Sequence, residues 1–225
     1  MPALAQTITA AAALSAVLLA GCAATAPSAP QNHGTAASVA APAAPGTVVT
    51  ASGHGWSAAG LDGPVPALGT CRIRWTAAGE PLPDPKCTPG ARDSAVTPAT
   101  LSATICRKGG YTASVRPPAT LTDAAKAKIM AAYGIPAQES SKYELDHLIP
   151  LGAGGASDVR NLWPEPNTFV ASTKSEYVHN DKDQIESDAQ RAICNGTAQL
   201  DALQGAFASD WTAVRLPHAS AGTAD

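Results

Sequence analysis

The chain has 225 residues, 45% of them hydrophobic, which suits one globular domain with a core and is too short for several domains. It carries 15 Lys and Arg against 18 Asp and Glu, so it lacks the overall basic excess typical of nucleic-acid-binding proteins. The charge is uneven: residues 71–142 hold 10 basic and 5 acidic side chains, whereas residues 143–225 hold 5 and 12. The basic half could contact phosphate while the acidic half holds a metal, or the two halves could simply attract each other in the fold.

Residues 1–22 have the features of a bacterial export signal. An apolar, Ala-rich stretch over residues 8–20 is too short to cross a bilayer. It ends in Leu-Ala-Gly-Cys, which resembles a bacterial lipobox and implies that Cys22 is lipidated. No Lys or Arg precedes Cys22, so a plain cleaved signal with an incidental cysteine is the alternative. We therefore expect an exported protein, lipid-anchored in the cell envelope in the first case and secreted in the second.

Composition also sets the expected limits of the domain. Residues 23–62 are dominated by Ala, Pro, Ser, Thr and Gly, which predicts a disordered tether, and residues 217–225 predict a disordered tail. The globular domain is therefore expected over residues 63–216. Its first part, residues 63–98, is rich in Pro and Gly and predicts irregular structure built from turns.

Apart from Cys22, the chain has four cysteines, and an even number in an exported chain favours two disulfides. Three connectivities are possible. We favour Cys71 with Cys87, which closes a local loop, and Cys106 with Cys194, which would clamp the N-terminal part onto the C-terminal helices. No pair has the CxxC spacing of a structural zinc site, so none is expected.

The next elements lead up to the central motif. A short helix is expected over residues 97–106, a brief extended segment over 111–115, and a clear amphipathic helix over 121–133. Arg116 stands just before Pro117-Pro118, where a fixed backbone could aim its guanidinium at a substrate phosphate. The alternative is a structural arginine paired with a core carboxylate.

Residues 143–164, YELDHLIPLGAGGASDVRNLWP, predict a β-hairpin. One strand is expected over residues 143–149 and a second over 159–163, joined by a glycine-rich loop. Asp146, His147 and Asn161 lie in this hairpin. A carboxylate can hold a hard divalent cation and an imidazole can take a proton from water near neutral pH, so the grouping suits metal-assisted hydrolysis.

The strings DHLIPLGAGG and NLWP resemble the first two thirds of an HNH nuclease motif, the ββα-metal or His-Me finger fold, in which a hairpin packs on one helix around a single divalent ion. The resemblance implies that Asp146 is a metal ligand, that His147 is the general base, and that Asn161 steadies the loop and so orients the histidine. A wider similarity to small exported bacterial HNH-like proteins runs from about Cys71 to Trp211, and is carried by LPDPKCTPGA, TIC, VRPP, YELDHLIPL, NLWP, KDQIE, ICNG and SDW.

Two helices are expected after the hairpin, over residues 173–193 and 200–214. The family places the third corner of the metal site near the start of the first of them. His179, Asn180 and Asp183 are the candidates, and we favour Asn180 because a neutral oxygen beside Asp146 suits a hard, partly hydrated cation. The alternative is that Asn180 only caps the helix.

The sequence thus predicts an α+β domain with a ββα-metal hairpin-plus-helix core over residues 143–190, flanking helices and a disulfide-bonded irregular N-terminal part. The resemblance implies a metal-dependent endonuclease, with Mg²⁺ as cofactor and nucleic acid, DNA rather than RNA, as partner. Two alternatives are an HNH-fold lipoprotein of the cell envelope that has lost catalysis and binds a partner or has a structural role, and a hydrolase of another phosphate-bearing substrate.

Overall fold

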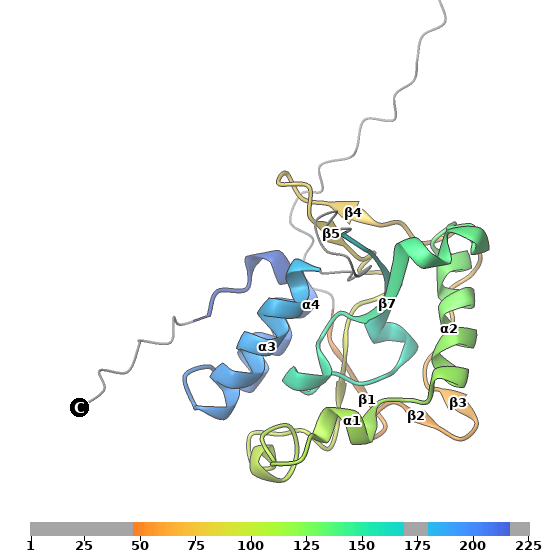
Figure 1. The fold of residues 1–225 in the computed structure, drawn as a ribbon. Coiled ribbons are helices and arrows are strands. Elements are labelled where there is room, and N and C mark those ends of the chain that lie inside the picture. The colour runs from red at the N-terminus through yellow and green to blue at the C-terminus, as the bar shows by residue number, and fades with distance from the viewer. Residues whose placement is uncertain (1–46, 169–179, 217–225) are drawn as a thin grey trace, which may run out of the picture. The chain divides into compact units, whose positions relative to one another are not determined.

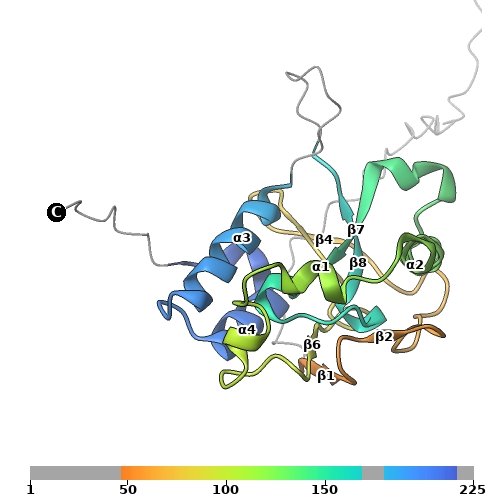
Figure 2. The same cartoon turned by 60° about the horizontal axis from the view of Figure 1, so that its bottom comes forward.

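The computed structural model describes residues 47–168 and 180–216, which combine short strands with helices in an α+β fold (Figures 1 and 2). The strands are β1 (Val49–Ala51), β2 (Trp56–Ser57), β3 (Gly60–Leu61), β4 (Arg74–Trp75), β5 (Pro81–Leu82), β6 (Ala91–Asp93), β7 (Tyr143–His147) and β8 (Leu162–Pro166). The α-helices are α1 (Tyr111–Val115), α2 (Ala119–Ala132), α3 (Asp181–Cys194) and α4 (Leu200–Asp210). Short 3-10 turns are η1 (Leu101–Ala103), η2 (Ala137–Lys142), η3 (Leu151–Ala153), η4 (Val159–Asn161) and η5 (Trp211–Ala213). Within these ranges no helix is long and apolar enough to cross a membrane.

Strands β7 and β8 form the predicted antiparallel hairpin, with Tyr143 opposite Pro166 and His147 opposite Leu162. The second strand begins later than expected, because residues 159–161 form the turn η4, in which the Asp158 carboxylate accepts from the Arg160 N–H at 2.9 Å. The strand also ends three residues later than expected, at Pro166, so its length is unchanged.

The hairpin lies between α2 on one side and α3 with α4 on the other (Figures 1 and 2). Its Trp163 is fully buried, as are Ile129 of α2 and Phe207 of α4, each at most 1% exposed. The apolar face predicted for the last helix is confirmed, although its final turn is the 3-10 turn η5; its buried members are Leu200, Leu203, Phe207, Trp211 and Val214.

The domain begins earlier than its composition suggested. Strand β1 pairs in parallel with β6, Ala51 is buried, and the Trp56 indole donates to the Val115 carbonyl at 2.7 Å. Residues 47–62, expected to be part of the tether, are therefore part of the domain. Backbone pairing between distant segments holds them there, and composition does not report it.

Local side-chain bonding changes two elements. The expected helix over residues 97–106 is reduced to η1, because the hydroxyl of Thr100 bonds to the Ala95 carbonyl at 2.7 Å and competes with helical bonding. Residues 111–115 are helical rather than extended, since Tyr111 and Val115, four positions apart, are both buried. Helix α2 matches the predicted helix but begins after Pro118 with no side-chain cap.

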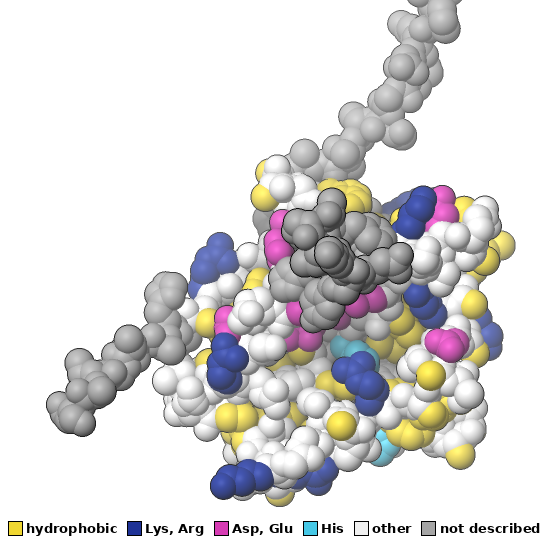
Figure 3. All heavy atoms as spheres, in the orientation of Figure 1, with side chains coloured by type: hydrophobic (Ala, Val, Ile, Leu, Met, Phe, Trp, Pro, Cys, Tyr) yellow, Lys and Arg dark blue, Asp and Glu magenta, His cyan; other side chains and the backbone are white. Residues whose placement is uncertain are grey.

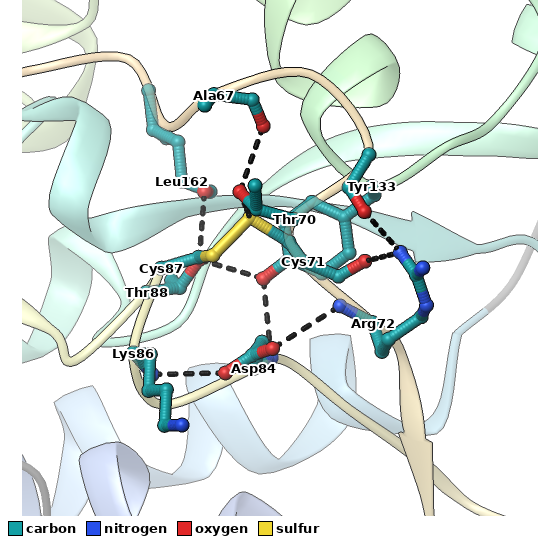
Figure 4. The surroundings of a disulfide bond; sticks show 11 residues. Ala67, Thr70, Cys71, Arg72, Asp84, Lys86, Cys87, Thr88, Tyr133 and Leu162 are labelled. Atoms are coloured by element: carbon teal, nitrogen blue, oxygen red, sulfur yellow. Dashed lines mark hydrogen bonds between the residues drawn. A yellow bond between two sulfur atoms is a disulfide. The ribbon is translucent and has the colours of Figure 1, made fainter.

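Both predicted disulfides are present. Cys71–Cys87 lies beside the end of α2, where the Tyr133 hydroxyl bonds to Thr88 at 2.9 Å and accepts from the Asp84 N–H at 3.1 Å (Figure 4). Cys106–Cys194 joins the segment after η1 to the last residue of α3. The two bonds attach the irregular N-terminal part to the helices, and they suggest that the protein folds in an oxidising compartment.

Candidate active site

The loop that follows β7 is held by the side chain of Asn161, which is fully buried. Its amide oxygen accepts from the N–H groups of Ile149 and Ala91 at 2.9 and 3.2 Å, and its NH₂ group donates to the carbonyls of Ile149 and Ala156, both at 2.9 Å. A Cβ on Gly155 would lie 1.8 Å from the Ile149 oxygen, so only glycine fits there. These contacts are those expected of a residue that braces the loop.

His147 is the last residue of β7 and its imidazole is 7% exposed. Its Nε2 lies 2.9 Å from the hydroxyl of the fully buried Ser157. Burial lowers the pKa of His147 to about 3, with Arg116 and Lys182 adding to the effect and Asp146 opposing it. The imidazole is therefore neutral at pH 7. When Nε2 carries the proton and donates to Ser157, Nδ1 has a free lone pair.

Asp146 does not stand alone at the hairpin end. Its Oδ2 accepts from the Trp163 indole and from the Lys182 ammonium, both at 2.8 Å. No hydrogen bond within the described ranges reaches its Oδ1, and Asp146 lines the pocket described below. One carboxylate oxygen thus accepts from two donors, and the other has no donor among the described residues.

Lys182, in the first turn of α3, is 1% exposed. Besides Asp146, its ammonium donates to the His147 carbonyl at 2.8 Å and to the Glu186 carboxylate one helical turn on. Burial disfavours the charged form, but Asp146, Glu186 and Glu165 outweigh burial and raise the pKa of Lys182. A buried positive charge therefore lies at the end of β7, against Asp146 and the His147 carbonyl.

The strand register brings two further carboxylates to the same place. Glu144 and Glu165 are directly opposite each other, and together with Asp146 they offer oxygens that all lie within 4.8 Å of one another. Burial raises the pKa of Glu165 strongly, and its Oε2, in a residue 2% exposed, has no hydrogen-bond partner among the described residues. Burial also raises the pKa of Glu144. We refer to Glu144, Asp146 and Glu165 as the acidic cluster.

Asn180 is the N-cap residue of α3 and is buried against this cluster. Its amide oxygen accepts from the Thr168 N–H at 3.0 Å, and its NH₂ group donates to Glu144. The Thr168 donor fixes the orientation of the amide, because a flipped amide would place two donors against each other. Asn180 thus presents N–H groups, and not an oxygen ligand, to the acidic cluster.

A pocket of about 260 Å³ opens in front of these residues, between β7, α1, η3 and α3. His147, Asp146 and Arg116 line it, and Arg116 and His147 also line an adjoining pocket of about 380 Å³ along the start of α2. The exposed Arg116 makes no ion pair with any residue that the structure describes. Near the middle of the face in Figure 3, acidic, histidine and basic side chains lie next to one another.

The contacts of Asp146 and Asn180 disfavour a divalent ion in the position that the family resemblance implies. Asp146 already shares its Oδ2 with an ammonium, and Asn180 turns N–H groups toward the cluster. At about 4 Å and an effective dielectric constant of about 20, two unit positive charges repel by about 4 kcal/mol, and a divalent ion doubles this repulsion. The ammonium held by Asp146 therefore opposes the binding of a divalent ion at the acidic cluster.

Comparison with protein-family models, with curated proteins and with solved structures gave no match. The HNH resemblance is thus a hypothesis carried by the sequence motif and weighed against the geometry of the pocket.

The structure gathers most of the residues singled out from the sequence. Asp146, His147 and Arg116 share one pocket with Asp183, and Asn161 braces the loop behind them. Cys22 and His179 lie outside the described residues.

Sequence reasoning missed Lys182, Glu186, Glu165 and Ser157. The KDQIE string held a signal for the first two, because Lys182 and Glu186 are four positions apart and so face the same way on a helix. Glu165 was missed because the second strand was expected to end at Trp163.

Proposed function

We propose that the protein hydrolyses phosphodiester bonds of nucleic acid, DNA in the first instance, outside the cytoplasm. The observation that carries the proposal is that a neutral, buried imidazole and an exposed guanidinium without an ion pair among the described residues line the same pocket. A base and an anion-binding group are the minimum that hydrolysis of a phosphate ester requires. Nucleic acid as the substrate class is taken from the HNH resemblance.

In the proposed reaction, a water molecule in the pocket gives a proton to Nδ1 of His147 while its oxygen forms a bond to phosphorus. The bond from phosphorus to the leaving oxygen breaks, and that oxygen keeps the electron pair and takes a proton from solvent. Arg116 donates N–H groups to the phosphate oxygens, where negative charge increases in the transition state. Ser157 holds the imidazole by accepting from Nε2.

The low pKa of His147 bears on this mechanism. An imidazole with a pKa of about 3 is a weak base. A phosphodiester anion bound beside it would raise that pKa, because the anion stabilises the imidazolium form. Base strength is therefore expected to develop when substrate binds.

The proposal is tested with the full chain on quenched-fluorophore DNA and RNA oligonucleotides, with a divalent cation or with a chelator. His147→Gln keeps a hydrogen-bonding group and should lower the rate of cleavage by about 100-fold or more, the scale of a lost general base. Arg116→Gln should weaken substrate binding by about 10-fold or more, since a bond to a charged group is lost. Lys128→Gln is the matched control for lost charge, because Lys128 is exposed on α2 and outside both pockets. Equal rates for wild type and His147→Gln would refute the proposal.

The low pKa of His147 also favours a second candidate, a domain that binds a phosphate-bearing ligand without cleaving it. Fluorescence anisotropy with the same oligonucleotides separates the two. Binding that Arg116→Gln weakens, together with no cleavage by wild type under either condition, would select the binding function.

The cellular site is part of the proposal. Two disulfides support an exported protein. We propose that acyl chains on Cys22 hold it at the membrane surface, with the residues before 47 as a spacer. Mass spectrometry of protein from the native envelope should find an acylated Cys22, and an unmodified mature N-terminus would show that the protein is secreted.

A further inference from the structure

The ammonium of Lys182 is placed as a bound cation would be. It reaches from the first turn of α3 to the end of β7, although Lys182 and His147 are 35 positions apart. Its three N–H groups are matched by three acceptors, namely the His147 carbonyl, Asp146 Oδ2 and Glu186 Oε1. The side chain is 1% exposed, so no N–H is left for a substrate in the pocket.

Of the acidic cluster, the ammonium contacts only Asp146, and no cation among the described residues contacts Glu144 or Glu165. Glu144, Asp146 and Glu165 bring three carboxyl oxygens within 4.8 Å of one another. Glu165 Oε2 is buried, in a residue 2% exposed, and within residues 47–168 and 180–216 it has no hydrogen-bond partner. A buried oxygen without a donor is unfavourable, and a hard divalent cation is the ligand that such oxygens accept.

Packing gives no separate reason to bury a lysine here. The Lys182 ammonium lies 5.9 Å from the centre of the Phe207 ring, and its hydrogen-bond partners are all oxygen atoms. Removing an ammonium from water is costly, and the carboxylates of Asp146 and Glu186 offset that cost together with the His147 carbonyl. The lysine is thus buried because of these acceptors, one of which belongs to the acidic cluster.

We propose that the Lys182 ammonium is the resident cation of the acidic cluster and takes the place that the ββα-metal fold gives a divalent ion. The cluster then binds Mg²⁺, Mn²⁺ or Ca²⁺ only when this ammonium is removed. The catalytic consequence, that hydrolysis does not need divalent ions, rests on the function proposed above. The identity of the cation in the acidic cluster does not depend on that function. Lys182 is then a positioning residue, which orients Asp146 and holds the carbonyl of His147.

Thermal unfolding of the full chain tests the cation directly, in chelator and in millimolar Mg²⁺, Mn²⁺ or Ca²⁺ at matched ionic strength. Wild type should unfold at the same temperature in all of these. Lys182→Met, which keeps the length of the side chain and removes the charge, should gain a shift with divalent ions. An ion at about ten times its Kd raises Tm by about 3–6 °C for a chain of this size.

Two further variants tie the effect to the cluster. Adding Glu165→Gln to Lys182→Met should abolish the gained shift, because one carboxylate is lost. Glu186→Gln alone should show no shift, because the ammonium stays. If Lys182→Met folds and unfolds at the same temperature with and without divalent ions, the inference is wrong.

The Tm of the wild-type protein tests the inference even if Lys182→Met does not fold. A wild-type Tm that divalent ions raise by several degrees, with Glu165→Gln removing the rise, would overturn the inference. A wild-type Tm that the ions leave unchanged supports it.

The cleavage assay separates this inference from the proposed function. Cleavage by wild type in chelator, at the rate seen with Mg²⁺, supports both. Cleavage that chelator abolishes and Mg²⁺ restores overturns the inference and leaves the hydrolytic function standing. Absence of cleavage in every condition defeats the hydrolytic function, and the thermal shifts still decide which cation the cluster holds.

Discussion

Replacing Asn161 with alanine removes four hydrogen bonds at once, two from the backbone N–H groups of Ala91 and Ile149 and two to the carbonyls of Ile149 and Ala156. The site is fully buried, so the groups left behind do not regain water easily. With a net loss of about 1 kcal/mol for each bond, and more for a group left unpaired, the free energy of unfolding should fall by roughly 3–5 kcal/mol. For a chain of this size that corresponds to a fall in Tm of roughly 10 °C or more.

The measurement is urea unfolding of the full chain followed by tryptophan fluorescence, beside Asn195→Ala as control. Asn195 is exposed at the end of α3, and its replacement should change stability by about 0.5 kcal/mol or less. Asn161→Asp keeps the two accepted bonds and replaces the NH₂ donor with an oxygen that faces two carbonyls. It should therefore be destabilised as well. An Asn161→Ala variant as stable as Asn195→Ala would show that the loop does not depend on this side chain, and our account of how His147 is oriented would fail.

Two more predictions concern pH and the disulfides. The pKa of His147 is lowered from 6.5 to about 3, so between these pH values the unfolded chain binds a proton that the folded chain does not. The contribution of His147 to the free energy of unfolding is therefore fully present above pH 6.5. It is lost as pH falls toward 3, by up to about 5 kcal/mol relative to His147→Gln. Urea unfolding of both proteins in chelator from pH 7 to 4 checks this, and parallel stability curves would refute it. Cys106 and Cys194 are 88 positions apart and Cys71 and Cys87 are 16 apart, so replacing the first pair with serine should cost about 5 kcal/mol and the second about 3 kcal/mol. An equal or reversed order of the two losses, measured by thermal unfolding, would contradict this loop-length argument.

Local patterns were enough to locate the central motif. The alternation in residues 143–147, the glycines that follow and the spacing to Asn161 predicted the hairpin and placed Asp146 and His147 at its end. The apolar spacing of α2 and α4 predicted their buried faces, and cysteine positions together with loop length favoured the correct disulfide pairs. These features depend on near neighbours or on few alternatives, so sequence alone determined them.

Long-range packing decided the rest. The local pairing with Glu186 does not by itself bury Lys182, and its burial follows from how the start of α3 packs on the hairpin. Glu165 entered the acidic cluster only because the strand register places it opposite Glu144. Arg116 lines the pocket from the C-terminal end of α1, whose residues 111–115 the sequence had predicted as extended.

The chemistry expected at the hairpin end therefore had two sources. Residue types and spacing determined that a carboxylate and an imidazole would stand there. The tertiary structure decided which cation faces the carboxylate, because side chains 35 positions apart meet only when the helix and the hairpin pack, and burial then makes their charges interact strongly.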